Sequence, residues 1–141
     1  MIDFNYQTKF RLKQSKKIKS WLEEICICEK KELGELCIVF CNDEMLLDYN
    51  KKYLKHDTLT DVITFDYCVK DKVSGDILIS TERVKENSKI YNENYFDEVN
   101  RVIAHGLLHL LGFKDKKEDQ KKIIRKKENY YLKKLNKLII R

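Results

Sequence analysis

Two histidines separated by three residues, His105 and His109, form the pattern in this chain that is best suited to chemistry. Residues four apart lie on one face of a helix, so both imidazoles would point the same way. Gly112 is placed to end that helix, and Asp115 follows three residues later, where it could turn back toward the pair. Two imidazoles and a carboxylate that converge in this way make a three-ligand site for a divalent metal, with a fourth position open to water or substrate. An open position is typical of catalytic metals, so this segment suggests an enzyme.

The alternative interpretation is that both histidines are core residues with ordinary hydrogen bonds. The chain has 3 His, and two of them share this register inside a strongly apolar segment. An imidazole buried without a partner is destabilising, and a metal would remove that penalty, so we favour the metal site. Zinc suits two imidazoles and a carboxylate, but iron(II) accepts the same set, and the pattern alone does not separate them.

Hydrolysis is the reaction class that such a centre favours. A metal with an open position lowers the pKa of bound water toward about 7 and polarises carbonyl or phosphoryl oxygens. Zinc proteases of the H-E-x-x-H type carry their general base directly after the first histidine, where this chain has Gly106. The protease base is therefore missing. A phosphodiester substrate remains open, and in RNA the 2′-hydroxyl could be the nucleophile without a base from the protein.

Positive charge is concentrated at the C-terminal end of the sequence. The formal net charge is +6, yet residues 116–141 hold eleven Lys and Arg against three acidic residues, and the preceding 115 residues sum to −2. This basic segment, which includes Lys121, Lys122, Arg125 and Lys126, could follow a phosphate backbone. It could equally be the solvated face of a lysine-rich helix, and the sequence leaves both interpretations open.

Length and composition indicate one domain covering residues 1–141. With 43% hydrophobic and 37% charged residues the composition is ordinary for a globular protein. No apolar run approaches the roughly 20 residues of a membrane span, and we expect no membrane partner. The first residues lack the pattern of a secretion signal, and the 5 Cys are an odd number without a C-x-x-C pair. We therefore expect reduced cysteines and a cytoplasmic location.

The hydrophobic pattern predicts an α/β (α+β) fold with a single mixed sheet of about four strands packed with helices, in the order βαβαββααα. Asn42 is predicted to cap a helix that carries Met45 and Tyr53, and Gly34 to interrupt the apolar pattern before a strand. The predicted strands are Ile2–Tyr6, Glu35–Cys41, Asp61–Val69 and Gly75–Ser80, and the other predicted helices are Leu12–Cys28, Ser80 to about Tyr91, Tyr95–Leu111 and Glu118–Leu138.

Three sequence blocks, in this order, resemble the YbeY family of bacterial rRNA maturation factors. The first, Tyr53 to Phe65, resembles the family's loop and strand before the hairpin, and Gly75–Ile77 resembles its next strand. The third is the H-G-x-L-H-L-x-G-F pattern from His105, with a third ligand ten residues after the first histidine. The resemblance covers about residues 35 to 120. It implies a zincin-like fold and a metal-dependent, single-strand-specific endoribonuclease with one zinc ion per chain.

The resemblance also implies a biological role and a set of site residues. The role is late 3′-end maturation of small-subunit (16S) rRNA and ribosome quality control, with the small ribosomal subunit, a ribosomal protein or a GTPase assembly factor as partners. It makes His105, His109 and Asp115 the metal-binding and catalytic residues, although many members have a histidine where this chain has Asp115. The expected substrate-binding residues are Lys55, His56, Asp57 and Thr60.

One further departure from the family pattern concerns the substrate side. The usual arginine after the tyrosine of the first block is Leu54 here, and Lys55 and His56 are the neighbours that could replace it. Asp57, Thr60 and Asp61 could line the cleft beside the metal, but turn chemistry before a strand would also explain them. Two other functions therefore stay open: a ribosome-biogenesis binding factor with a mainly structural metal and little catalysis, and a metal hydrolase of a small molecule or peptide.

Overall fold

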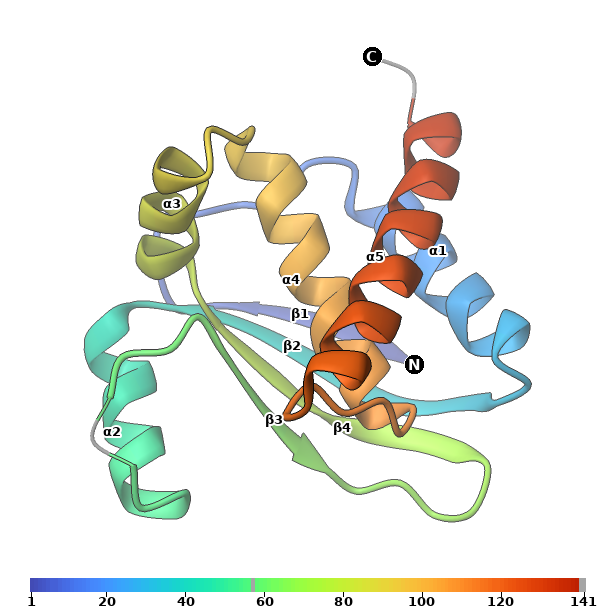
Figure 1. The fold of residues 1–141 in the computed structure, drawn as a ribbon, viewed down its shortest axis with the longest axis horizontal. Helices are drawn as coiled ribbons and strands as arrows, with labels where there is room; N and C mark the ends of the chain where they lie inside the picture. The colour runs from blue at the N-terminus through green and yellow to red at the C-terminus, as the bar shows by residue number, and fades with distance from the viewer. Residues whose placement is uncertain (57, 140–141) are drawn as a thin grey trace.

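The computed structural model describes residues 1–56 and 58–139 and contains one mixed sheet with helices on both faces (Figure 1). The element order βαβαββααα and the α/β class agree with the sequence prediction. The strands are β1 (Ile2–Tyr6), β2 (Glu32–Cys41), β3 (Val62–Asp66) and β4 (Lys72–Ser80), and the helices are α1 (Ser15–Cys28), α2 (Asp43–Tyr53), α3 (Thr81–Ile90), α4 (Tyr95–Leu110) and α5 (Glu118–Leu138).

The sheet has the strand order β1-β2-β4-β3, in which β1 and β4 run parallel to β2 and β3 runs antiparallel to β4. The two inner strands carry buried residues such as Ile38 and Ile77, which are paired across the sheet and fully covered. Because β4 is its one neighbour in the sheet, β3 is an edge strand, and a short segment connects it to α2. That segment is the first of the three blocks with the family pattern.

The main core lies between the sheet and helices α1, α4 and α5. Helix α1 buries one apolar stripe that includes Trp21, whose indole N–H donates to the backbone oxygen of Tyr131 in α5 at 2.7 Å. Helix α2 packs on the opposite face of the sheet, where Leu46 and Leu78 belong to a smaller core (Figure 1). Its Asn42 side chain accepts from the backbone N–H of Met45, as the predicted cap should.

Several predicted boundaries are wrong, each for a local reason. Gly34 does not precede the strand but lies inside β2, within the irregularity between Leu33 and Leu36, where an added Cβ would be 2.9 Å from the oxygen of Val73. Helix α1 begins at Ser15 rather than at residue 12, because Gln14 has the left-handed φ of 54°. Strand β3 ends at Asp66 and β4 begins at residue 72, three residues earlier than predicted.

The cysteines are free, as expected, and two of them, Cys26 and Cys41, are buried. Burial is the main reason that the pKa of each of these two thiols is raised to about 11, which lowers the fraction of reactive thiolate at neutral pH. None of the described helices is long and apolar enough to cross a membrane.

Candidate metal centre

Helix α4 and the turn after it bring His105, His109 and Asp115 together. The helix is capped at its start by Asn94, whose side chain accepts from a backbone N–H in the first turn. At its end Gly112 has φ +105°, the N–H of Gly112 donates to the oxygen of His109, and the N–H of Phe113 donates to the oxygen of Leu108. These two bonds form a Schellman motif, which reverses the chain and directs Asp115 back over the last turn.

The three side chains meet at one point, each with one donor atom. The Nε2 atoms of His105 and His109 are 2.9 Å apart, and Oδ2 of Asp115 lies 3.2 Å from each of them. The three side chains are 23%, 26% and 38% exposed, so the point where they meet remains open to solvent. The structure therefore brings together the three residues that the sequence predicts as metal ligands.

This triangle of atoms has the size that a bound metal requires. Zinc with tetrahedral bonds of about 2.0–2.1 Å keeps its ligand atoms about 3.3 Å from each other, and the three separations fall within a few tenths of an ångström of that value. Two ring nitrogens and a carboxylate oxygen at such distances repel each other unless a cation or a shared proton lies between them. Within the described residues, this is the one group of three or more ligating side chains that could hold a metal ion.

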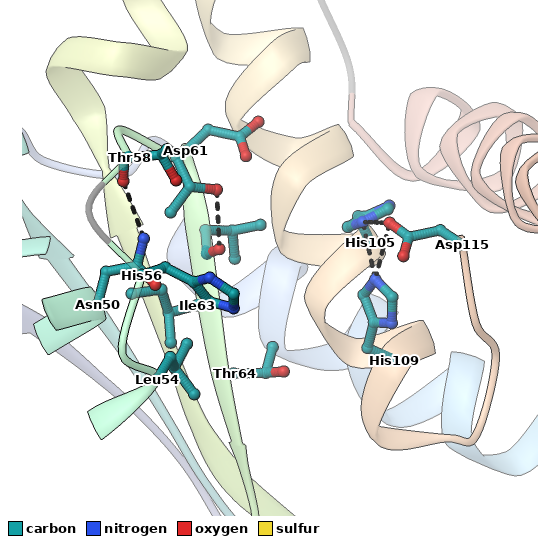
Figure 2. A pocket seen from close by; sticks show the side chains of 12 residues that line it. Asn50, Leu54, His56, Thr58, Asp61, Ile63, Thr64, His105, His109 and Asp115 are labelled. Atoms are coloured by element: carbon teal, nitrogen blue, oxygen red, sulfur yellow. Dashed lines mark hydrogen bonds and ion pairs between the residues drawn. The ribbon is translucent and has the colours of Figure 1, made fainter. Parts of the chain in front are cut away.

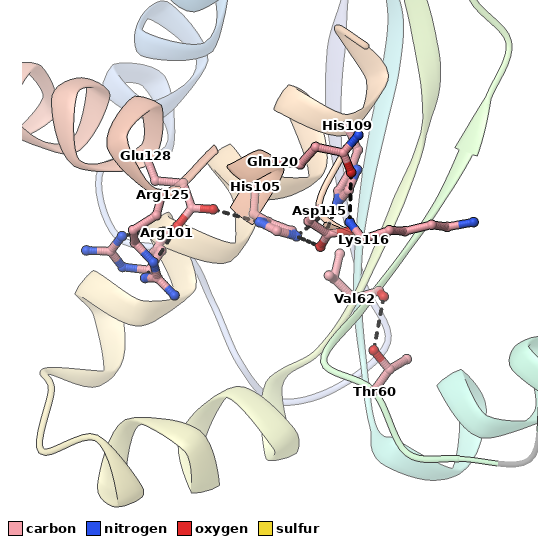
Figure 3. A network of polar contacts seen from close by, with 10 residues as sticks. All are labelled: Thr60, Val62, Arg101, His105, His109, Asp115, Lys116, Gln120, Arg125 and Glu128. Carbon is pink, nitrogen blue, oxygen red and sulfur yellow. Dashed lines mark hydrogen bonds and ion pairs between the residues drawn. The ribbon is translucent and has the colours of Figure 1, made fainter. Parts of the chain in front are cut away.

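A buried carboxylate, Glu128 of α5, holds His105 from behind (Figure 3). Its Oε2 accepts from Nδ1 of His105 at 2.6 Å, so the proton of the neutral imidazole resides on Nδ1 and the lone pair of Nε2 points into the triangle. The Glu128 side chain is 3% exposed, and its Oε1 lies 3.1 Å from Nη1 of Arg101 and 3.5 Å from Nη1 of Arg125. The two arginines thus compensate the charge of the buried Glu128 carboxylate, and His105 and Arg101 donate hydrogen bonds to it.

The electrostatics of this pair follow from the short contact. Burial lowers the pKa of His105, but the hydrogen bond and charge of Glu128, with a smaller contribution from Asp115, outweigh it and leave the pKa above its ordinary value. Burial raises the pKa of Glu128, but His105 and then Arg125 outweigh it and leave this pKa below its ordinary value. The lowered pKa keeps Glu128 charged, and a charged carboxylate behind the ring makes the neutral imidazole a stronger ligand.

Glu128 was not among the site residues predicted from the sequence. Its signal is present, however, because the buried stripe of α5 consists of residues 124, 128, 131 and 135, and Glu128 is its one carboxylate. An acidic residue at a buried helical position needs a partner from elsewhere in the fold. The sequence alone does not identify that partner, because His105 is 23 residues away.

A cleft of about 490 Å³ lies beside the triad and is closed on its far side by the segment between α2 and β3 (Figure 2). Two of the expected substrate-binding residues, His56 and Thr60, line it, whereas Lys55 is exposed outside it with φ 56°. Asp57 lies outside the described residues. The hydroxyl of Thr60 donates to the oxygen of Val62 at 3.4 Å, which fits the alternative of turn chemistry. Leu54, at the position of the family's arginine, also lines the cleft.

Asn50 fixes the loop on that far side of the cleft. It is 4% exposed, and its amide nitrogen donates to the oxygen of Thr58 at 2.8 Å. Its backbone oxygen accepts from the N–H of His56 at 3.1 Å. Asp61 also faces the cleft, and burial raises the pKa of its carboxyl group, while the charge of His105 opposes that shift. The sequence analysis named Asp61 as a cleft residue but missed Asn50.

Close packing of α4 on the sheet explains the glycine at position 106. In the structure α4 crosses β4 here, and a Cβ on Gly106 would lie 2.7 Å from Cγ2 of Ile77. The glycine lets α4, which carries both histidines, lie close to the sheet at Ile77 of β4.

Comparisons with known proteins agree over nearly the whole chain. The family model described as "Endoribonuclease YbeY" matches residues 2–136. Proteins named Endoribonuclease YbeY are 46% identical in Flavobacterium johnsoniae, over 92% of this chain and 93% of the relative, and 44% identical in Karelsulcia muelleri, over 94% of both. The solution structure of TM1509 from Thermotoga maritima matches with a TM-score of 0.69 and 26% identity, over 96% of this chain and 89% of that one.

Proposed function

The chain belongs to the YbeY family of endoribonucleases, and from that premise we propose that it hydrolyses single-stranded RNA at a metal ion held by His105, His109 and Asp115. The observation that carries the proposal is the convergence of three ligand atoms at separations of 2.9–3.2 Å beside an open cleft. Family members bear the name of a nuclease, so the chain is an enzyme of the hydrolase class.

Access to the metal position supports catalysis over a structural role for the ion. Structural zinc sites are closed by four protein ligands, whereas catalytic ones keep a position for water or substrate. Here three ligands meet at the wall of a cleft of about 490 Å³. A bound metal would supply Lewis acidity toward a phosphoryl oxygen and a water of lowered pKa. Zinc is our proposal for that metal, one ion per chain, because the donor set suits it.

The remaining residues of the site would bind and orient. Glu128 holds the Nδ1 proton of His105 and thereby fixes the ring. We propose that His56, on the opposite wall of the cleft (Figure 2), and Thr60, which also lines the cleft, contact the RNA strand, together with Lys55 and Asp57. Asn50 holds this loop in place through Thr58. The absence of a carboxylate at Gly106 fits a reaction in which the 2′-hydroxyl or a solvent-derived group attacks without a protease-type base.

For the biological substrate we propose the precursor of small-subunit (16S) rRNA, cleaved near its 3′ end. This follows from the resemblance of the three sequence blocks to rRNA maturation factors. With that substrate the protein would act in the cytoplasm on the small ribosomal subunit, assisted by a ribosomal protein or a GTPase assembly factor, and would take part in ribosome quality control.

The proposal is tested by cleavage of a labelled single-stranded RNA and of its duplex by metal-free protein, before and after zinc is restored. We expect cleavage of the single strand alone, and only with metal. Cleavage that persists in chelator, or no cleavage after zinc and iron(II) have each been restored, would contradict it. Retention of bound zinc by a protein that does not cleave would favour the structural metal instead.

A further inference from the structure

The lysine-rich helix α5 uses its two flanks in different ways. On the flank toward α1, Nζ of Lys127 lies 2.9 Å from Oε2 of Glu29, and Nζ of Lys134 lies 3.6 Å from Oε1 of Glu24. These lysines belong to the packing of α5 against α1, beside the hydroxyl of Tyr131, which also donates to Glu29. The positive charge on this flank is therefore matched by carboxylates of the same molecule.

The other flank carries positive charge that the fold matches only in part, through the contact of Arg125 with Glu128 at 3.5 Å. We call it the basic flank, and it consists of Lys121, Lys122, Arg125 and Lys126, which together with Asn129 line a shallow hollow of about 450 Å³. Within residues 1–56 and 58–139, no carboxylate lies within ion-pair distance of Lys122 or Lys126. Lys121 has only a distant surface pair, 3.6 Å from Glu118, which contributes little.

The basic flank adjoins the metal centre through direct contacts. Arg125 lies against Glu128, and Glu128 holds His105 (Figure 3). Helix α5 also begins three residues after Asp115. The basic flank spans the first turns of α5 after this ligand, and from Lys121 to Asn129 it extends about 12 Å at 1.5 Å per residue. That length accommodates roughly three phosphates of a nucleic-acid strand.

From this arrangement we propose that the basic flank of α5 binds the phosphates of the RNA strand that leaves the metal cleft, and so extends the substrate site beyond the scissile bond. The inference rests on the proposed endoribonuclease function. The lysine head groups would bind phosphates as point charges without reading sequence. Long substrates would gain affinity from this surface, while substrates confined to the cleft would not.

Two matched double variants test this. Lys122→Gln/Lys126→Gln removes two charges from the basic flank, and Lys133→Gln/Lys137→Gln removes two exposed lysines with the same spacing from the far end of the same helix. Binding of a labelled 16-nucleotide single strand is measured in chelator at several salt concentrations, so no cleavage is needed. Each phosphate contact on a single strand contributes about 0.7 to the salt slope, so the first variant should lower the slope by about 1.4 and weaken binding about 25-fold at 0.1 M salt. The second should leave both nearly unchanged.

Cleavage of a trinucleotide and of the 16-nucleotide strand, with zinc restored, provides the second readout. The flank variant should cleave the trinucleotide like the wild type and should have a raised KM for the long strand. An unchanged slope, or an equal loss in both double variants, would overturn the role of the basic flank. If the wild type cleaves neither RNA while the slope still falls as expected, the endoribonuclease function fails and the RNA-binding surface stands.

Discussion

Replacing Glu128 by glutamine should weaken metal binding without any change to a ligand. Glutamine keeps the shape of the side chain and one acceptor oxygen for Nδ1 of His105, now 2.6 Å from a full carboxylate, but removes the negative charge. Loss of such a partner behind a ligating histidine lowers metal affinity about 10- to 100-fold, which corresponds to about 1.4–2.8 kcal/mol. His105 itself would remain in place.

The same substitution should also lower the stability of the metal-free protein. Glu128 is buried, and it compensates Arg101, which is 23% exposed. Breaking a fully buried pair by removing one charge is destabilising by about 3–5 kcal/mol. The loss of unfolding free energy for Glu128→Gln should be smaller, about 1–3 kcal/mol. The reason is that Arg125, the second arginine beside Glu128, is 61% exposed and remains screened by water.

Two measurements separate the effects. Metal affinity is obtained by competition with a chromophoric chelator, and the free energy of unfolding by denaturant titration in the presence of EDTA. Glu118→Gln is the matched control, because Glu118 is on the same helix and 85% exposed, and it should change neither quantity. If Glu128→Gln lowers stability but binds metal within twofold of the wild type, the reasoning about the His105 tautomer is refuted. If it changes neither quantity, the importance of the buried cluster is refuted as well.

Three further substitutions probe the site from other sides. Asp115→Asn should lower metal affinity by more than about 100-fold, beyond the effect expected for a residue behind a ligand. It should shift the unfolding free energy by less than about 0.5 kcal/mol, because the Asp115 side chain is 38% exposed. A strong loss of stability would contradict this. Gly106→Ala should lower the free energy of unfolding by about 1–2 kcal/mol, measured by heat or denaturant. Overpacking against Ile77 should exceed the gain of about 1 kcal/mol in helix propensity. A stabilised variant would show that α4 can move away from the sheet. Asn50→Ala should remove the hydrogen bond to Thr58, worth about 1 kcal/mol. It should raise KM for RNA and leave metal affinity unchanged. A lower kcat at constant KM would instead place the loop in the chemical step.

The parts of the site that are local in sequence could be predicted from the sequence. The spacing of His105 and His109 and the stop at Gly112 are helix properties, and the structure has the Schellman turn that such a stop requires. The mixed sheet and the element order follow from periodicity, and the structure agrees with them. The metal-binding and catalytic roles of the three converging side chains remain predictions.

What depends on long-range packing was missed or misplaced. Glu128 contacts His105 across 23 residues, and only the fold shows that they meet. Gly34 was expected before the strand, but the pairing of Leu33 and Leu36 on either side of it with β4 keeps it inside β2. Lys55 does not line the cleft and has a left-handed backbone, and its contact with the substrate stays a prediction.

The most direct test of the central claim is cleavage of a labelled precursor of the small-subunit rRNA 3′ end by the wild type and by His105→Ala/His109→Ala. Both proteins would be purified identically, freed of metal and then supplied with zinc. The account predicts cleavage by the wild type alone, at a discrete position in single-stranded RNA. No cleavage by either protein, or equal cleavage by both, would contradict a metal-dependent nuclease built on these two histidines.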